Sequence, residues 1–124
     1  MEIFNRSNSK NTCPLEVLTS YLLVSPRNSS ARNLSVQISF VPVGSEQPVH
    51  AHEPEQCYYI IQGKGLMMIE DEAREVYPGD AVHIPSNKRH GIKNIGDVPL
   101  EYLTANSPAF TKEYEDKLWP SHPA

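Results

Sequence analysis

The segment 44–63 reads GSEQPVHAHEPEQCYYIIQG and places His50 and His52 two residues apart, near valine, isoleucine and tyrosine residues that favour extended backbone. In a strand, side chains two residues apart lie on the same face. In a helix the same two side chains would point about 200° apart. We therefore expect one strand to present both imidazoles to one point, where they could chelate a metal ion.

The segment 79–94, GDAVHIPSNKRHGIKN, carries a further histidine in a comparable setting. Its pattern predicts a strand, a turn at 85–87 and a second strand, with His90 just past the turn. His83 lies in the first of these strands. If Val82 and Ile84 point inward, His83 points outward and is not expected to be a ligand. His90 is therefore the third candidate ligand.

These two segments resemble the two sequence motifs of the cupin family. The first motif is a glycine, five residues, His-x-His, three or four residues, a glutamate, six residues and a glycine. Four positions of this chain match it: Gly44, His50, His52 and Gly63. Four positions match the second motif: Gly79, Pro85, His90 and Asn94. The resemblance implies a cupin barrel, a homodimer and a small-molecule substrate.

Two positions depart from the family pattern, and both departures are chemically mild. Gln56 stands where glutamate is usual, and its side-chain carbonyl oxygen can still coordinate a metal. Asn87 stands where glycine is usual, and asparagine adopts left-handed backbone angles at small cost. The resemblance therefore implies a metal site formed by His50, His52, Gln56 and His90.

The rest of the chain predicts an all-β protein. Short segments rich in β-branched and aromatic residues indicate strands at 21–24, 34–40, 49–52, 57–62, 65–69, 74–77, 81–84, 91–94 and 100–104. The connections between them are too short for a crossover helix, which favours antiparallel pairing. Repeated short strands with glycine and proline between them suit a jelly roll, the double-stranded β-helix that the cupin resemblance also implies.

The length of 124 residues indicates a single domain spanning 1–124. We expect an N-terminal arm at 1–14, a core barrel at 34–105 and a C-terminal tail at 108–124. In the tail, Phe110, Tyr114 and Leu118 fall at helical spacing and predict a short amphipathic helix that ends at Pro120. Such a helix could brace the barrel or a second subunit, or it could act as a lid over the site.

Charge and hydropathy limit the classes of partner. The net charge is −4 and the chain has no basic cluster, which argues against nucleic acid as the main partner. The sequence shows neither the pattern of a signal peptide nor an apolar stretch long enough to span a membrane. We therefore expect a cytoplasmic protein that does not act at a membrane.

The implied ligand set indicates the kind of metal and of chemistry. Three imidazoles and one amide oxygen suit manganese, iron, nickel, copper or zinc, and they argue against calcium or magnesium. Four protein ligands leave positions open for water or substrate in ions that prefer six-fold coordination, as in catalytic sites. Because Gln56 is neutral, the ion keeps its full formal charge and polarises substrate oxygens more strongly. This modestly favours redox-neutral chemistry over oxygenation.

Three functions remain open from the sequence. The first is an isomerase, lyase or hydrolase acting on a small oxygenated substrate such as a sugar or sugar acid. Some small cupins with a His, His, Gln, His set act on sugar acids, and that resemblance supports the first function. The second is a metal-dependent dioxygenase, and the third is a non-enzymatic sensor or small-molecule-binding barrel.

Tyr58 is the candidate general acid or base. It lies two residues after Gln56 and therefore on the same inward face of the expected strand. The alternative is that Tyr58 packs in the barrel wall with its hydroxyl hydrogen-bonded. No specific substrate follows from the sequence.

Overall fold

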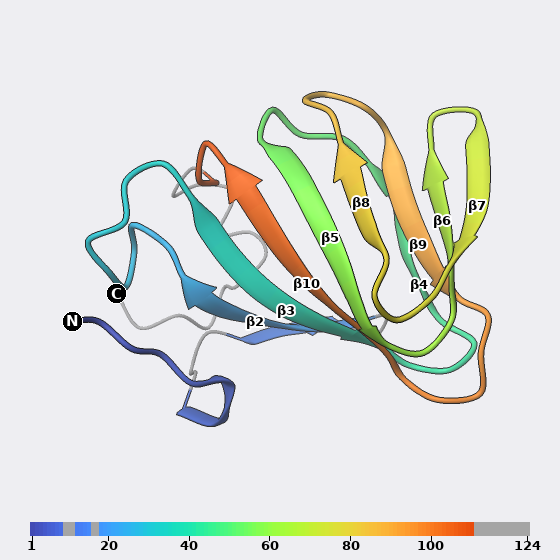
Figure 1. Cartoon of the computed structure of the whole chain (residues 1–124), viewed down its shortest axis with the longest axis horizontal. Coiled ribbons are helices and arrows are strands. Elements are labelled where there is room, and N and C mark those ends of the chain that lie inside the picture. The colour runs from blue at the N-terminus through green and yellow to red at the C-terminus, as the bar shows by residue number, and fades with distance from the viewer. Residues whose placement is uncertain (9–11, 16–17, 111–124) are drawn as a thin grey trace.

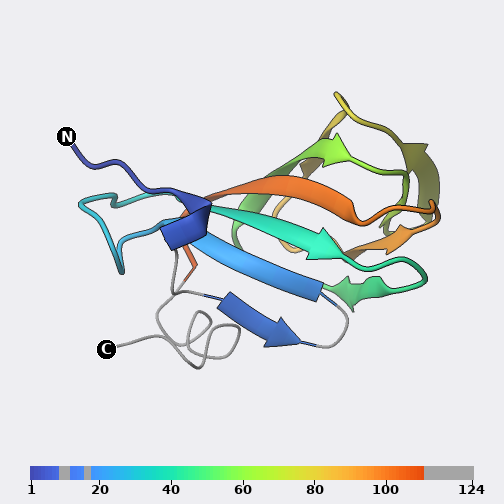
Figure 2. The same cartoon turned by 90° about the horizontal axis from the view of Figure 1, so that it is seen from below.

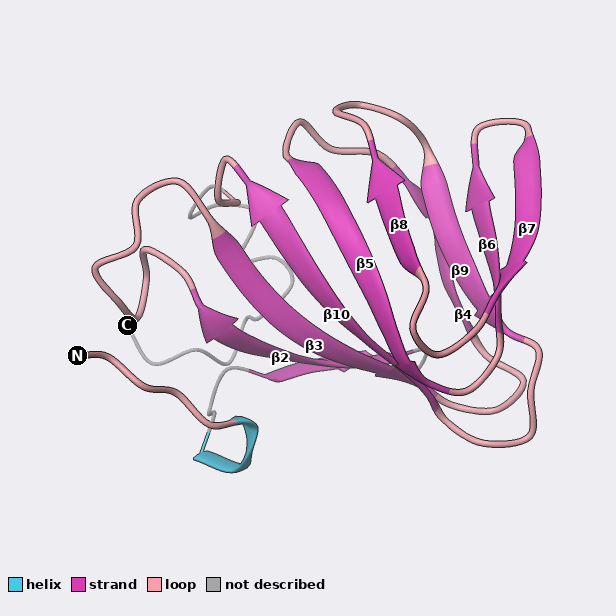
Figure 3. Cartoon of the chain, in the orientation of Figure 1, coloured by secondary structure: helices cyan, strands magenta, loops and turns pink. Residues whose placement is uncertain are grey.

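The computed structural model describes residues 1–8, 12–15 and 18–110, and strands form nearly all of their regular structure (Figures 1 and 3). One 3-10 turn, η1, spans Arg6–Asn8. The strands are β1 (Thr12–Leu15), β2 (Leu18–Val24), β3 (Ser35–Val41), β4 (Glu46–His50), β5 (Glu55–Gln62), β6 (Gly65–Ile69), β7 (Glu72–Val76), β8 (Ala81–Ile84), β9 (His90–Asn94) and β10 (Leu100–Ser107).

The strands form two antiparallel sheets that face each other. One sheet has six strands in the order β1-β2-β3-β10-β5-β8, and the other has four in the order β4-β9-β6-β7. In Figure 2 the first sheet passes along one side of the molecule while the strands of the second close the opposite side at the right. This arrangement is that of a double-stranded β-helix, as expected from the sequence.

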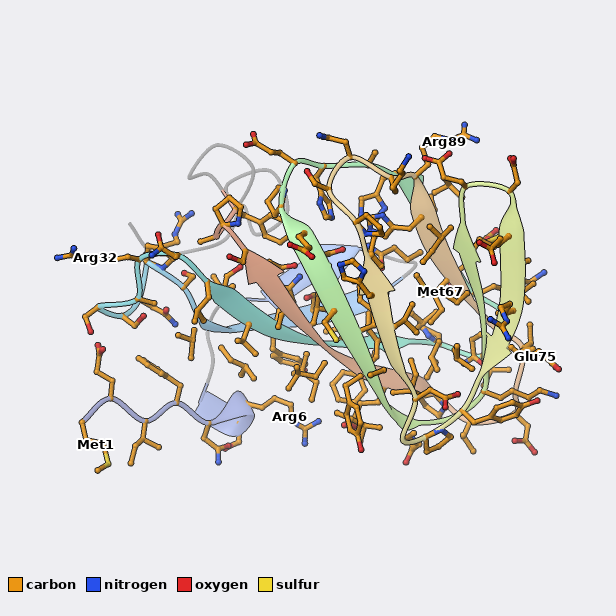
Figure 4. All side chains as sticks on the ribbon, turned by 45° about the horizontal axis from the view of Figure 1, so that its top comes forward. Met1, Arg6, Arg32, Met67, Glu75 and Arg89 are labelled. Carbon is orange, nitrogen blue, oxygen red and sulfur yellow. The ribbon has the colours of Figure 1, made fainter. Side chains whose placement is uncertain are left out.

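Alternation along several strands places apolar side chains between the sheets. Ile60, Ile84, Ile92 and Leu100 are fully buried there. Met67, labelled in Figure 4, is 3% exposed and belongs to the same core cluster. Complete burial of such a side chain contributes about 1.5–3 kcal/mol to folding. The core that holds the barrel together is therefore shared by both sheets.

The interior becomes polar toward one end of the barrel. Strands β5 and β10 are antiparallel, and their register pairs Gln56 directly with Asn106. Both side chains point inward, and they are 4% and 2% exposed, respectively. At the other end of the same strands the inward positions are the apolar Ile60 and Leu100. The order of residues along two strands thus creates an apolar floor beneath a buried polar region.

The prediction of a single strand over 49–52 is wrong at its C-terminal end, because β4 ends at His50. His52 lies in the loop between β4 and β5. Its carbonyl oxygen accepts a hydrogen bond of 2.9 Å from the Asn87 N–H in the turn after β8. The backbone of His52 therefore bonds to that turn and leaves the sheet ladder.

The turn after β8 confirms the expectation for Asn87. Its φ is 64°, in the left-handed region that glycine and asparagine adopt most readily. At Gly63, between β5 and β6, φ is +92° and an added Cβ would lie 3.0 Å from the Pro99 carbonyl oxygen. The geometry at Gly63 therefore requires a residue without a side chain.

The expected C-terminal helix falls almost entirely on residues 111–124, which lie outside the described residues. Phe110 is the last residue described and is 6% exposed. Within the described part of the chain, no helix is long and apolar enough to cross a membrane.

Candidate metal centre

Three histidines converge at the polar end of the barrel. His50 ends β4, His90 begins β9, and the two residues face each other across the antiparallel pair. The ring centroids lie 4.4 Å apart for His50 and His90, 4.9 Å for His52 and His90, and 5.4 Å for His50 and His52. One ring nitrogen of each residue lies within 4.8 Å of the other two. The three side chains could therefore hold one metal ion.

Backbone carbonyl groups fix the protonation of the three rings. Each Nδ1 lies 2.9–3.0 Å from a carbonyl oxygen two residues away in the chain: that of Pro48, Pro54 or Lys88. A carbonyl oxygen only accepts hydrogen bonds, so Nδ1 carries the proton and the lone pair of the neutral ring is on Nε2. Metal-ligating histidines are commonly oriented by such a bond. The Nε2 lone pair of each of the three rings is therefore available to coordinate a metal ion.

Burial favours the uncharged form of two of the rings. It lowers the pKa of His90 to about 4, with smaller contributions in the same direction from His50 and His52 and an opposing one from the Lys88 carbonyl. Burial is also the main cause that lowers the pKa of His52, followed by its proximity to His50. Neutral imidazole is the form that coordinates a metal.

A hydrogen-bond network fixes the orientation of the Gln56 amide. The Asn106 Nδ2 donates to Ser35 O at 3.3 Å, to Ser35 Oγ at 3.0 Å and to Gln37 Oε1 at 2.8 Å. Because the Ser35 carbonyl can only accept, the nitrogen of Asn106 must face it. This directs Asn106 Oδ1 toward Gln56, whose Nε2 donates to it at 2.5 Å. The network therefore leaves Gln56 Oε1 available for another partner.

Two of the buried atoms at this site have no hydrogen-bond partner among the described residues: Gln56 Oε1 and His90 Nε2. Buried polar atoms are normally satisfied, because leaving them unpaired costs free energy. Gln56 also lies close enough to the His52 ring to have a small effect on the His52 pKa. An oxygen and ring nitrogens gathered at one place fit the preferences of a divalent transition metal.

Tyr58 lies beside the histidines and is 1% exposed. Its ring centroid is 6.2 Å from that of His90 and 4.6 Å from that of Tyr102, on which it stacks. The hydroxyl groups of Tyr58 and Tyr102 donate to Gln47 Oε1 at 3.3 and 2.6 Å. Burial raises the pKa of Tyr102 well above the usual range of a phenol.

Gln47 and Asn106 are site residues that the sequence analysis did not identify. Asn106 has a sequence signal, since it continues the inward alternation of Tyr102 and Thr104 two residues beyond the expected strand end. Gln47 has no such sequence signal, because regular alternation in a strand with an inward His50 would place the Gln47 side chain on the outer face. A register shift between Gln47 and His50 allows both to face inward.

Two neighbouring features define the limits of the site. The Phe110 ring packs edge-on against His52, with centroids 5.2 Å apart. His83 is exposed, and its Nε2 lies 2.5 Å from Glu55 Oε1, away from the three histidines. His83 therefore points outward, as the alternation of β8 predicted.

Comparison with known proteins places the chain in a family. The family described as Cupin domain matches residues 37–106, which include every residue of the site except Phe110 and Ser35. An uncharacterized protein of Methanocaldococcus jannaschii, MJ1618, is 42% identical over 80 residues, which is 64% of each chain. This chain spans less than two thirds of that relative and about half of several other curated relatives.

Solved structures with low sequence identity share the fold. A predicted oxalate decarboxylase from Thermotoga maritima has a TM-score of 0.77 at 20% identity, with 86% of this chain and 99% of that chain covered. KdgF from a Halomonas species has a TM-score of 0.76 at 21% identity, with 88% and 96% covered. Because the Cupin domain family matches more than half of this chain, the chain belongs to the cupin family.

Proposed function

We propose that this cupin binds a divalent transition metal through His50, His52, Gln56 and His90 and is an enzyme with redox-neutral chemistry. The reaction class is isomerisation, elimination or hydrolysis, and the substrate is a small oxygenated molecule such as a sugar or sugar acid. The observation that carries the proposal is the convergence of three oriented imidazoles with the buried Gln56 Oε1, which has no hydrogen-bond partner of its own among the described residues. When bound, the metal would act as a Lewis acid toward a substrate oxygen.

The neutral ligand set supports redox-neutral chemistry. The three imidazoles and one amide contain no negative charge, so the full charge of the ion remains available to attract substrate oxygens. The Gln56 amide nitrogen donates to Asn106, so the amide oxygen of Gln56 points away from Asn106 and can coordinate a metal. A carboxylate at position 56 would instead place negative charge against Asn106 Oδ1.

We assign the proton transfer to Tyr58. Its position beside His90 and its inward orientation on β5 support this role. Its hydroxyl is linked through Gln47 to the edge of the histidine cluster, since Gln47 Nε2 lies 3.5 Å from His50 Nε2.

The test is a screen of metal-loaded protein against sugars and sugar acids, with oxygen consumption recorded in parallel. Turnover without oxygen consumption is the expected result. Tyr58→Phe should then lower kcat/KM by about 100- to 10,000-fold, the usual contribution of a general acid or base, at unchanged metal content. The control is Tyr77→Phe, at a tyrosine just after β7 that is 46% exposed. Oxygen-dependent turnover would indicate a dioxygenase, and saturable binding without turnover would indicate a sensor.

We also propose that the protein forms a homodimer through the outer face of the six-stranded sheet. Tyr59 and Ile61 of β5 are 48% and 39% exposed there, and Leu103 of β10, paired with Tyr59, is partly exposed beside them. Covering apolar side chains of this kind stabilises association. Sedimentation equilibrium should give twice the chain mass of 13.9 kDa, and a monomer at micromolar concentration would contradict the proposal.

A further inference from the structure

We infer that the Gln47 amide donates a hydrogen bond to an oxygen atom of a small carboxylate that binds beside the three histidines. Tyr58 and Tyr102 hold this amide in its donating orientation. The inference rests on the proposed metal site and names the chemical class of its ligand. Gln47 is thus a ligand-binding residue, distinct from the four residues proposed to hold the metal.

The backbone places Gln47 at the site. Strand β4 pairs Gln47 with Ile92, whose side chain is fully buried between the sheets. The two strands approach closely here, because a Cβ on Gly91 would lie only 2.9 Å from the Gln47 carbonyl oxygen. The register shift that follows Gln47 brings His50 onto the same inward side. Gln47 and His50 therefore reach the same space from one strand.

The neighbours of the Gln47 amide determine which of its ends faces the histidines. His50 Nδ1 lies 3.0 Å from the Pro48 carbonyl oxygen and must carry the proton, so the His50 Nε2 of the neutral ring is an acceptor. The atom of Gln47 that lies 3.5 Å from this Nε2 is therefore the amide nitrogen, because an oxygen would face a lone pair. The amide oxygen in turn accepts from two phenol groups.

The contact with His50 leaves the donor capacity of Gln47 largely unused. A nitrogen-to-nitrogen separation of 3.5 Å is long for a hydrogen bond. If the His50 lone pair is given to a metal ion, it can no longer accept from Gln47. The NH2 group then needs an acceptor on a bound ligand. Of the two amides beside the three histidines, Gln56 presents an acceptor oxygen and Gln47 presents a donor NH2 group.

This combination selects a carboxylate over a neutral or amine ligand. An amide NH2 group can only donate, so it favours a ligand that presents acceptor oxygens. Hydrogen bonds to charged groups are stronger than those between neutral groups, particularly where water is excluded. A neutral set of protein ligands also leaves the cation free to attract an anion. Both effects favour a small carboxylate at this position.

The experiment measures binding of oxalate to nickel-loaded protein by calorimetry, with metal content determined for every sample. Gln47→Met keeps the length of the side chain but removes the donor, and it should raise the Kd for oxalate by 10- to 100-fold, at about the strength of a charged hydrogen bond. Ethylenediamine also chelates nickel through two atoms but offers no acceptor oxygen, so its affinity should not change. Glu46→Gln, at the exposed neighbouring position, is the matched control and should bind oxalate as the wild type does.

Gln47→Glu is the second variant, because it keeps an acceptor for both phenol groups if Gln47→Met fails to fold. It should also weaken oxalate binding. Equal oxalate affinity in the wild type and a folded Gln47 variant at equal metal content would overturn the inference. So would a nickel-loaded wild type that does not bind oxalate. In both cases the metal site itself would stand, whereas a wild type that binds no metal would refute the proposed function and the inference together.

Discussion

Replacing His90 by alanine is expected to eliminate stoichiometric metal binding. His90 is 1% exposed, its Nδ1 is held by the Lys88 carbonyl, and its buried Nε2 has no hydrogen-bond partner in the described part of the chain. Loss of groups that only orient metal ligands typically costs 10- to 100-fold in metal affinity, so loss of a ligand should cost more than about 100-fold. Elemental analysis after dialysis against a weak chelator measures the effect.

The control for this experiment is His83→Ala. His83 is an exposed histidine on the outer side of β8 and is paired with Glu55, so its removal should leave the metal content unchanged. Far-ultraviolet circular dichroism should show β-structure in both variants, because the core residues Ile60, Ile92 and Leu100 remain in place. Retention of one metal per chain in folded His90→Ala would contradict the proposed ligand set.

The metal-free protein is expected to lose stability as the pH falls from about 6.5 to about 4. The pKa of His90 is about 4 in the folded protein and about 6.5 in the unfolded chain. Between these values the unfolded state binds more protons, so the free energy of unfolding decreases with falling pH. The pKa difference corresponds to about 3 kcal/mol, lost by pH 4 and fully retained above pH 7. The lowered pKa of His52 acts in the same direction.

Urea denaturation of chelator-treated protein at pH 7 and pH 4 measures this loss. His90→Gln is the comparison, because glutamine does not titrate and the contribution of His90 should disappear. Between pH 7 and pH 4, the free energy of unfolding of His90→Gln should therefore decrease by about 3 kcal/mol less than that of the wild type. An identical decrease in both proteins would show that the folded state does not disfavour the charged His90.

The fold could be predicted from local patterns that survive in the three-dimensional structure. In β3 the apolar alternation indicated the wrong face, because the polar Ser35, Gln37 and Ser39 are buried while the apolar residues between them are partly exposed. Alternation in β5 correctly placed Gln56 and Tyr58 on the inward face, and the turn at 85–87 has the left-handed Asn87 that its sequence predicted. These features depend on residues close together in the chain, whose steric preferences act in any context. The short connections predicted the antiparallel sense of the pairing but not the partners, since pairs such as β3–β10 and β4–β9 join strands far apart in the chain.

The site could be predicted only in part. The convergence of His50, His52 and His90 was expected from motif spacing, yet the reason given for His50 and His52 was wrong, since His52 lies beyond the strand. It is positioned by hydrogen bonds to Pro54 and Asn87. One of these bonds lies within the loop of His52 and the other joins it to the turn after β8, and neither leaves a periodic trace in the sequence.

Gln47 shows most clearly what a single sequence does not contain. Regular alternation would put Gln47 and His50 on opposite faces, because their positions differ by three, an odd number. The register shift between them depends on pairing with β9, more than forty residues later in the chain. The same holds for the Gln56 amide, whose orientation is fixed by Asn106 and Ser35 from two other strands.

The most direct test of the proposed metal centre is anomalous diffraction from crystals of the metal-loaded protein, recorded on both sides of the absorption edge of the bound metal. We expect one anomalous peak within bonding distance of Nε2 of His50, His52 and His90 and of Oε1 of Gln56. A peak elsewhere, or ligation through Nδ1 of these histidines, would refute the proposed ligand set.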